Sequence, residues 1–216
     1  MEENTRDKVR EIKKSLRLAM NGVVSTLQRR QGLDYKINFG VEIPRLKGIA
    51  ETHAKDKELA EALWQDNIRE CKMLAIFLMP ENGAPEVADR WISETKFTEI
   101  ADHLAMHMLC RLPNAWDKTL QWAADNDGLH AYCGYLTISH LVRRGVMPTE
   151  EQELEFFKHL ADLREEQGVA GRCALNAAMN YLDRTPGAAT RLKEVAMTHY
   201  NALPASIAAL LESFEE

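Results

Sequence analysis

The stretch Phe97–Leu109 carries four side chains able to do chemistry, all within nine consecutive residues. They are the carboxylates of Glu99 and Asp102 and the imidazoles of His103 and His107. At helical spacing Glu99, His103 and His107 fall at i, i+4 and i+8, along one flank of a helix. Two histidines so placed could bind zinc, but the glutamate that directly follows the first histidine of a zinc-peptidase helix is missing. We interpret the flank as largely solvent-facing side chains paired along the helix, and no metal or other cofactor is predicted.

The composition predicts a soluble and mainly helical protein. The 216 residues are 45% hydrophobic and 28% charged, with only 11 glycines. The net charge of −6 argues against a protein that coats nucleic acid through bulk positive charge. Residues 1–72 hold 15 Lys and Arg against 12 Asp and Glu, whereas the remainder hold 12 against 21. A local basic surface in the N-terminal part therefore stays compatible with the charge.

Neither the start of the chain nor its most apolar run points to a membrane. The first residues are charged and have no apolar signal-peptide core, and the apolar run 73–79 is too short to span a bilayer. The four cysteines are widely spaced in apolar helical contexts, which favours buried free thiols: Cys71, Cys110, Cys133 and Cys173. We expect a cytoplasmic protein without a membrane partner.

Helical periodicity runs through nearly the whole chain. Ile68, Cys71, Ala75 and Leu78 recur at helical spacing, and Thr149 with Gln152 forms a capping box. No segment alternates with period two, so no strand is predicted. The predicted helices are 3–29, 44–54, 57–64, 67–79, 85–94, 97–111, 114–125, 129–144, 149–166, 169–183, 188–201 and 204–214.

Short turns between these helices predict how they pack. Each helix must bury its apolar face against a neighbour, and stacked antiparallel pairs do this most simply. The spacing of about 36 residues per pair is close to the period of HEAT-type repeats. We therefore expect an all-α fold, a HEAT-like superhelix of about 12 helices in antiparallel pairs. It should form a single domain over residues 1–216, with a concave groove.

Three segments carry a resemblance to a known family. The first, NFGVEIPRLKGIAETH (38–53), leads from an aromatic-Gly-Val turn to a proline at a helix start. The second, LAEALWQDNIRECKMLAIFLM (59–79), joins an L-x-x-x-L-W pattern to an acid and an apolar helix. The third, GRCALNAAMNYLDRTPGAATRLK (171–193), is a helix rich in small residues. In this order they resemble the DNA alkylation repair family of AlkD-like HEAT-repeat glycosylases, from about residue 35 to about residue 195.

The resemblance implies a superhelix that cradles duplex DNA and excises positively charged alkylated purines. Asp102 falls on the family's catalytic aspartate, which would stabilise a cationic sugar as the charged base departs. Thr98 falls on a family tryptophan, and a second tryptophan would fall near Ala177. Ala131 and Tyr132 stand where the family's essential arginine is expected. Because only the aspartate is kept, we expect excision to be weak or absent.

Further side chains are candidate DNA contacts. Aromatic rings could meet bases, and arginines at helix ends could meet phosphates. The candidates are Phe97, Thr98, Trp122, Tyr132, Arg143, Arg144 and Arg184, with Arg111 as a further cation. Core packing for the rings and complementation of helix dipoles for the arginines are the alternatives. For Asp102 the alternative is an ordinary exposed helix aspartate.

Two functions remain open from the sequence. The first is a DNA alkylation repair-like protein that binds duplex DNA in its groove, with Asp102 as the residue that would support excision. The alternative is a non-enzymatic HEAT scaffold that holds a protein partner on the same concave surface. The family resemblance favours the first, whereas the net acidity and the missing arginine favour the second.

Overall fold

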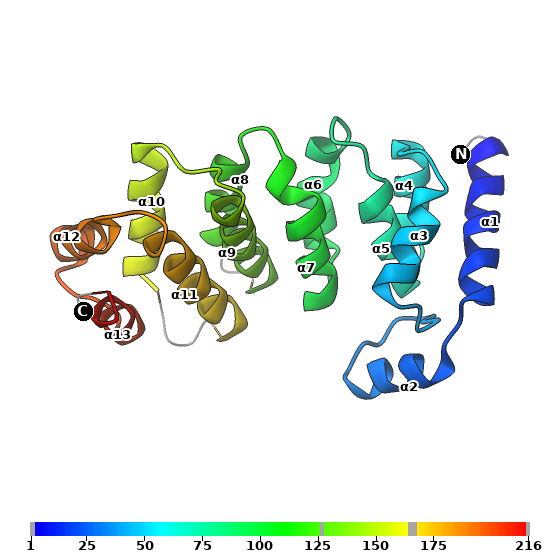
Figure 1. Cartoon of the computed structure of the whole chain (residues 1–216), viewed down its shortest axis with the longest axis horizontal. Coiled ribbons are helices and arrows are strands. Elements are labelled where there is room, and N and C mark those ends of the chain that lie inside the picture. The colour runs from blue at the N-terminus through cyan, green and yellow to red at the C-terminus, as the bar shows by residue number, and fades with distance from the viewer. Residues whose placement is uncertain (1–2, 126–127, 164–167, 215–216) are drawn as a thin grey trace. The chain divides into compact units, whose positions relative to one another are not determined.

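The computed structural model describes residues 3–125, 128–163 and 168–214, and these are almost entirely helical (Figure 1). Within these ranges one isolated bridge, between Ile37 and Ile68, is the extent of β-structure, so the predicted all-α class is confirmed. No helix in them has the length and hydropathy that a bilayer crossing requires. The helices are α1 (Glu3–Leu18), α2 (Gly22–Arg30), α3 (Ile43–Glu51), α4 (Lys57–Trp64), α5 (Arg69–Leu78), α6 (Ala84–Ser93), α7 (Thr98–His107), the 3₁₀ helix η1 (Leu109–Arg111), α8 (Ala115–Ala123), α9 (Gly128–Arg143), α10 (Glu150–Ala161), α11 (Gly168–Leu182), α12 (Ala188–Tyr200) and α13 (Ala205–Glu212).

The first helix differs from the prediction. A single helix over 3–29 is wrong, because the chain breaks before Asn21 and α2 starts afresh. The Asn21 side chain accepts the N–H groups of Val23 and Val24, an N-cap that satisfies two donors at the new helix end. Near the middle, α7 ends at His107 and the chain tightens into η1. The helix predicted over 149–166 ends at Ala161, and its last predicted residues, 164–166, lie outside the described ranges.

The chain divides into two compact units, Met1–Ala88 and Asp89–Glu216. Each is considered by itself, and the single domain expected over 1–216 stays a prediction. In the first unit α3 and α4 pack on α5, and α1 packs on α4. Fully buried apolar side chains fill this contact, among them Ile12, Leu46, Leu63, Trp64 and Met73.

A buried ion pair braces the loop that leads into α3. The Glu70 carboxylate accepts the backbone N–H groups of Phe39 and Val41 at 3.1 and 3.2 Å. Arg69 donates to the Val41 carbonyl at 3.0 Å and to Glu70 at 3.1 Å. Gly40, with φ +69°, turns the loop here, and a Cβ would lie 2.2 Å from the Asn21 carbonyl oxygen. The geometry of this loop thus explains the NFGVE motif of the first segment and Glu70, the acid of the second segment.

The second unit has two helical layers. In one layer α9 packs between α7 and α11, and in the other α10 packs between α8 and α12 (Figure 1). The layers meet closely where α8 crosses α9, because a Cβ on Gly134 would lie 2.5 Å from the Ala123 nitrogen. At the start of α10 the predicted capping box is confirmed, with Thr149 and Gln152 bonded reciprocally.

Candidate functional site

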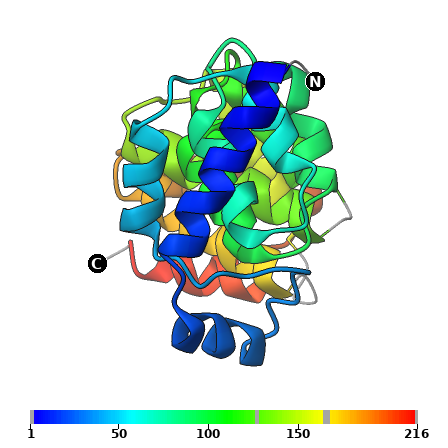
Figure 2. The ribbon, with the colours of Figure 1, turned by 90° about the vertical axis from the view of Figure 1, so that its right-hand side faces the viewer.

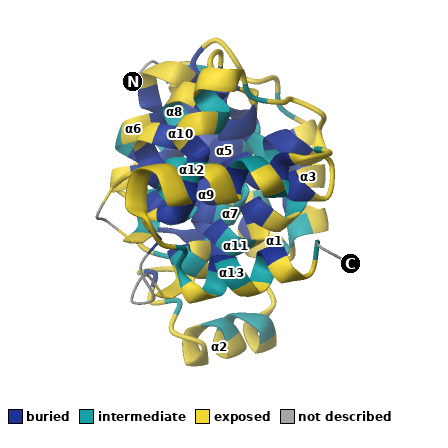
Figure 3. Cartoon of the chain, turned by 90° about the vertical axis from the view of Figure 1, so that its left-hand side faces the viewer, coloured by how far each residue is buried: buried dark blue, intermediate teal, exposed yellow. Residues whose placement is uncertain are grey.

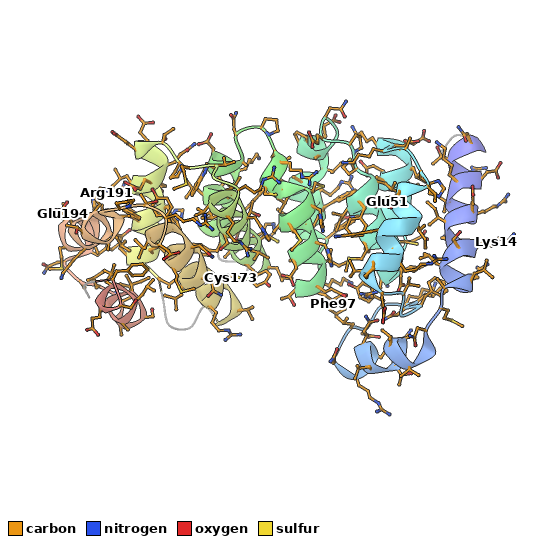
Figure 4. All side chains as sticks on the ribbon, viewed as in Figure 1. Lys14, Glu51, Phe97, Cys173, Arg191 and Glu194 are labelled. Carbon is orange, nitrogen blue, oxygen red and sulfur yellow. The ribbon has the colours of Figure 1, made fainter. Side chains whose placement is uncertain are left out.

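Asp102 lies in a polar cluster built by three neighbouring helices of one layer. It comes from α7, and the Tyr132 hydroxyl on α9 donates to its Oδ1 at 2.5 Å. Cys173 on α11 (labelled in Figure 4) lies near enough to Asp102 and Tyr132 for both to affect the pKa of its thiol. Asp102 and Tyr132 are half-buried, and Cys173 is buried. The carboxylate and the phenol are therefore bonded to each other across α7 and α9, and the thiol on α11 lies near them.

Burial dominates the electrostatics of this cluster. It raises the pKa of Asp102 above its ordinary value of 3.8, and nearby Glu99 adds to the rise, while the Tyr132 hydrogen bond and His103 oppose it. Burial, followed by the hydrogen bond to Asp102, also raises the pKa of Tyr132. Burial and then the Asp102 charge raise the pKa of Cys173 to about 11. The phenol and the thiol are therefore protonated at neutral pH, so both are hydrogen-bond donors and poor nucleophiles.

Asp102 is not the ordinary exposed helix aspartate of the alternative interpretation. It is half-buried, and one of its oxygens is bound by Tyr132 at the contact between α7 and α9. Tyr132 was expected as an aromatic DNA contact, and its hydroxyl role was missed. The signal available was position, since Tyr132 is one of the two residues, with Ala131, that stand where the family's arginine is expected, thirty residues after Asp102.

The histidine flank of α7 is less exposed than expected. Glu99, His103 and His107 are half-buried rather than solvent-facing. The two imidazole rings stack on each other, with centroids 5.6 Å apart and planes 10° from parallel. Among the described residues no group of three His, Cys, Asp or Glu side chains is arranged to hold a metal ion.

The other predicted aromatic contacts differ in access. Trp122 is only 5% exposed, and its indole N–H donates to Asp89 Oδ1 at 2.8 Å. A DNA contact by its ring would require the surrounding side chains to move. Phe97 precedes α7 as its N-cap residue and is half-buried, whereas Thr98 is exposed (Figure 4 labels Phe97).

A basic cluster lies where α9 and η1 end. Arg143 and Arg144 are exposed at the end of α9, and Arg111 is exposed on η1. Arg144 and Arg111 both lie near the Cys110 thiol, where their charges oppose the effect of burial on its pKa. His140 also lies in this cluster. Burial, and then the charges of Arg143 and Arg144, lower its pKa to about 4. His140 was missed by the sequence analysis although it precedes Arg143 by three residues on the same helix face.

Two further features complete the second unit. Arg184 is exposed just beyond the end of α11. A hollow between α8 and α10 is lined by carboxylates, namely Asp117, Glu151 and Glu155, together with His159. The second unit thus carries a basic cluster at one place and an acidic hollow at another.

Comparisons with known proteins agree with this architecture. Residues 27–181 match the model of the family described as DNA alkylation repair enzyme. A solved structure, described as a new family of proteins related to the HEAT-like repeat DNA glycosylases with affinity for branched DNA structures, aligns with a TM-score of 0.71. The alignment covers 95% of this chain and 93% of that one at 17% identity, so the likeness shows the fold and confirms a HEAT-like repeat. A search of the curated proteins gives no significant match.

Proposed function

The chain belongs to the DNA alkylation repair enzyme family, and from this premise we propose that it binds DNA and excises alkylated purines weakly or not at all. The observation that carries the proposal is the bond from the Tyr132 hydroxyl to Asp102. A neutral phenol thus donates to the carboxylate that the resemblance assigns to catalysis, from one of the two positions, Ala131 and Tyr132, where the resemblance places a cationic arginine. We further propose that the protein acts in the cytoplasm, where its four buried free cysteines fit a reducing medium.

The basic cluster supports the binding half of the proposal. Arg111, Arg143 and Arg144 are exposed and close to one another around Cys110 and His140. Arginine guanidinium groups suit phosphate oxygens, and such contacts give affinity that depends little on sequence. The solved relative is described as having affinity for branched DNA, and we extend DNA binding, to duplex or branched forms, to this chain.

The Asp102 cluster supports the catalytic half. Excision of a cationic purine needs an ionised carboxylate aimed at the sugar as positive charge develops there. Here burial raises the pKa of Asp102 and so disfavours the ionised form, the Tyr132 hydrogen bond opposes that rise only in part, and the same bond engages one oxygen. Removing one such electrostatic element costs on the order of 10²–10³ in rate in other enzymes. Asp102 is the one residue we expect any residual excision to depend on.

The test incubates the purified full chain with methylated duplex DNA and measures released base. Asp102→Asn serves as the matched variant, because it keeps the shape of the side chain and removes the charge. We expect DNA binding without release above the spontaneous background, equal in both proteins. Release that is robust and lost in Asp102→Asn would show that the catalytic half of the proposal is incorrect.

A protein scaffold is the second candidate, and the acidic hollow favours it. Asp117, Glu151 and Glu155 between α8 and α10 would suit a basic peptide rather than DNA. The strong acidity of residues 73–216 agrees with that choice. Binding to DNA at low salt separates the two functions: a scaffold of this kind gives none, and the DNA-binding protein gives affinity that falls steeply with salt.

A further inference from the structure

Helix α2 presents its apolar side chains to solvent. None of its residues is buried (Figure 3). Val23 is 81% exposed and Leu27 is 54% exposed, while Leu18 at the end of α1 and Met20 in the following turn are 81% and 63% exposed. At i and i+4, Val23 and Leu27 share one helix face, and Arg30 at i+7 continues it. In Figure 2 helix α2 lies beyond the C-terminal end of α1, in the same unit.

The polar face of α2 is the one attached to the first unit. Ser25 Oγ donates to the Asn38 carbonyl at 2.7 Å, and Asn38 Nδ2 donates to Gln28 Oε1 at 2.9 Å. The Asn21 N–H donates to the Phe39 carbonyl at 2.9 Å. On a helical wheel Asn21, Ser25 and Gln28 lie opposite Val23 and Leu27. A soluble helix normally turns the apolar face inward, so α2 is inverted, and its own hydrogen bonds hold it that way.

The segment that carries this apolar face is basic. Residues 17–36 contain four cationic side chains and one acid, a net charge of +3. The cations are Arg17, Arg29, Arg30 and Lys36, all exposed. Among the described residues none of these four forms a side-chain ion pair with a carboxylate. Exposed apolar side chains with exposed cations close to them in the chain match a partner that offers both phosphates and the faces of bases.

We propose that α2 is a DNA wedge: Val23 and Leu27 contact unstacked bases at a branch point, and the exposed cations of the same segment contact the flanking phosphates. The inference rests on the proposed DNA binding and specifies which DNA the protein prefers. Apolar side chains that enter DNA do so between base steps that are already open or easily opened. A linear duplex hides its base faces, whereas a junction exposes them, so the apolar face stabilises only the complex with branched DNA.

Two contributions are separable in this surface. The cations act on every DNA, because phosphates are present in duplex and junction alike. The apolar face acts only where base faces are accessible. Substituting Val23 and Leu27 should therefore change the preference for branched DNA and leave the affinity for linear duplex unchanged. Because α2 has no buried residue, these substitutions leave the core intact.

The experiment uses the full chain with Val23→Gln and Leu27→Gln combined. A four-way junction and a linear duplex with equal numbers of phosphates are the probes, and affinity is read by fluorescence anisotropy. Burial of two aliphatic side chains predicts a junction affinity lower by at least about tenfold in the variant. The matched control combines Leu154→Gln and Met197→Gln on α10 and α12, which are 39% and 49% exposed. We expect the control to bind both probes as the unchanged protein does.

A second readout reports the wedge itself. 2-Aminopurine placed beside the branch point should brighten on binding of the unchanged protein, because its stacking is lost, and stay dim with the variant. Equal junction affinity of variant and unchanged protein would overturn the proposal. The proposal would also be overturned if the variant lost binding to anionic phospholipid vesicles, or lost self-association, while its junction binding stayed unchanged. Binding of duplex and junction with equal affinity overturns the wedge alone, whereas absence of all DNA binding overturns the proposed function as well.

Discussion

Replacing Tyr132 with phenylalanine tests the Asp102 cluster directly. The change removes one hydroxyl and leaves the half-buried ring on α9. Hydrogen bonds to ionised groups contribute about 1.5–3 kcal/mol. Since Asp102 and Tyr132 are both half-buried, solvent offsets part of the loss, and we expect the free energy of unfolding to fall by about 1–2 kcal/mol.

The pH dependence of this effect has a defined sign. The pKa of Asp102 in the folded protein is raised above its ordinary value of 3.8. The folded state therefore binds the Asp102 proton more tightly, so the stabilising contribution of the carboxyl is present at low pH and is lost as pH rises through the folded pKa. The Tyr132 hydrogen bond lowers that pKa, so Tyr132→Phe should extend this loss to higher pH. Asp102→Asn should remove the dependence.

A double-mutant cycle between Tyr132→Phe and Asp102→Asn is the assay. Urea unfolding of the four proteins at pH 7 gives the coupling free energy, and a series from pH 4 to pH 7 gives its pH dependence. Tyr200→Phe is the control, because Tyr200 is 41% exposed and has no part in the cluster. Additivity of the two substitutions within about 0.3 kcal/mol would refute the pairing of Tyr132 with Asp102.

Two other predictions concern different parts of the chain. Glu70→Gln should destabilise the first unit by about 3 kcal/mol, because an amide replaces a buried charge that pairs with a guanidinium and accepts two backbone N–H groups. Urea unfolding measures the loss, and Glu11→Gln at an exposed position is the control that should leave stability unchanged. Combined Arg143→Gln and Arg144→Gln should weaken DNA binding at low salt. The slope of log affinity against log salt should then become shallower by about 1.8, which an unchanged slope would contradict.

The helices could be predicted from the sequence because their signals are local. Apolar periodicity and the Thr149 capping box depend only on residues a few positions apart. The break at Asn21 was missed because the residues on both sides of it favour helix, although Asn is itself a preferred N-cap residue and Asn-Gly marks a turn.

The candidate site could be predicted only in part because it is assembled across helices. Asp102 and Tyr132 are thirty residues apart, and their hydrogen bond depends on the relative height of α7 and α9, which no local pattern specifies. The same limit applies to Trp122, whose bond to Asp89 spans 33 residues. The inverted face of α2 was missed for another reason. Periodicity reports that apolar residues share a face but does not report which way that face points.

The central claim is that the protein holds DNA without efficient excision, and one single-turnover experiment tests it. Methylated duplex DNA is mixed with enough protein to bind all of it, as judged by anisotropy in the same tube, and free methylated purine is measured over time. Full binding with release at the spontaneous rate, unchanged in Asp102→Asn, is the predicted result. Release that rises with bound protein and disappears in Asp102→Asn would contradict the account, because Asp102 would then be a working catalytic carboxylate despite its bond to Tyr132.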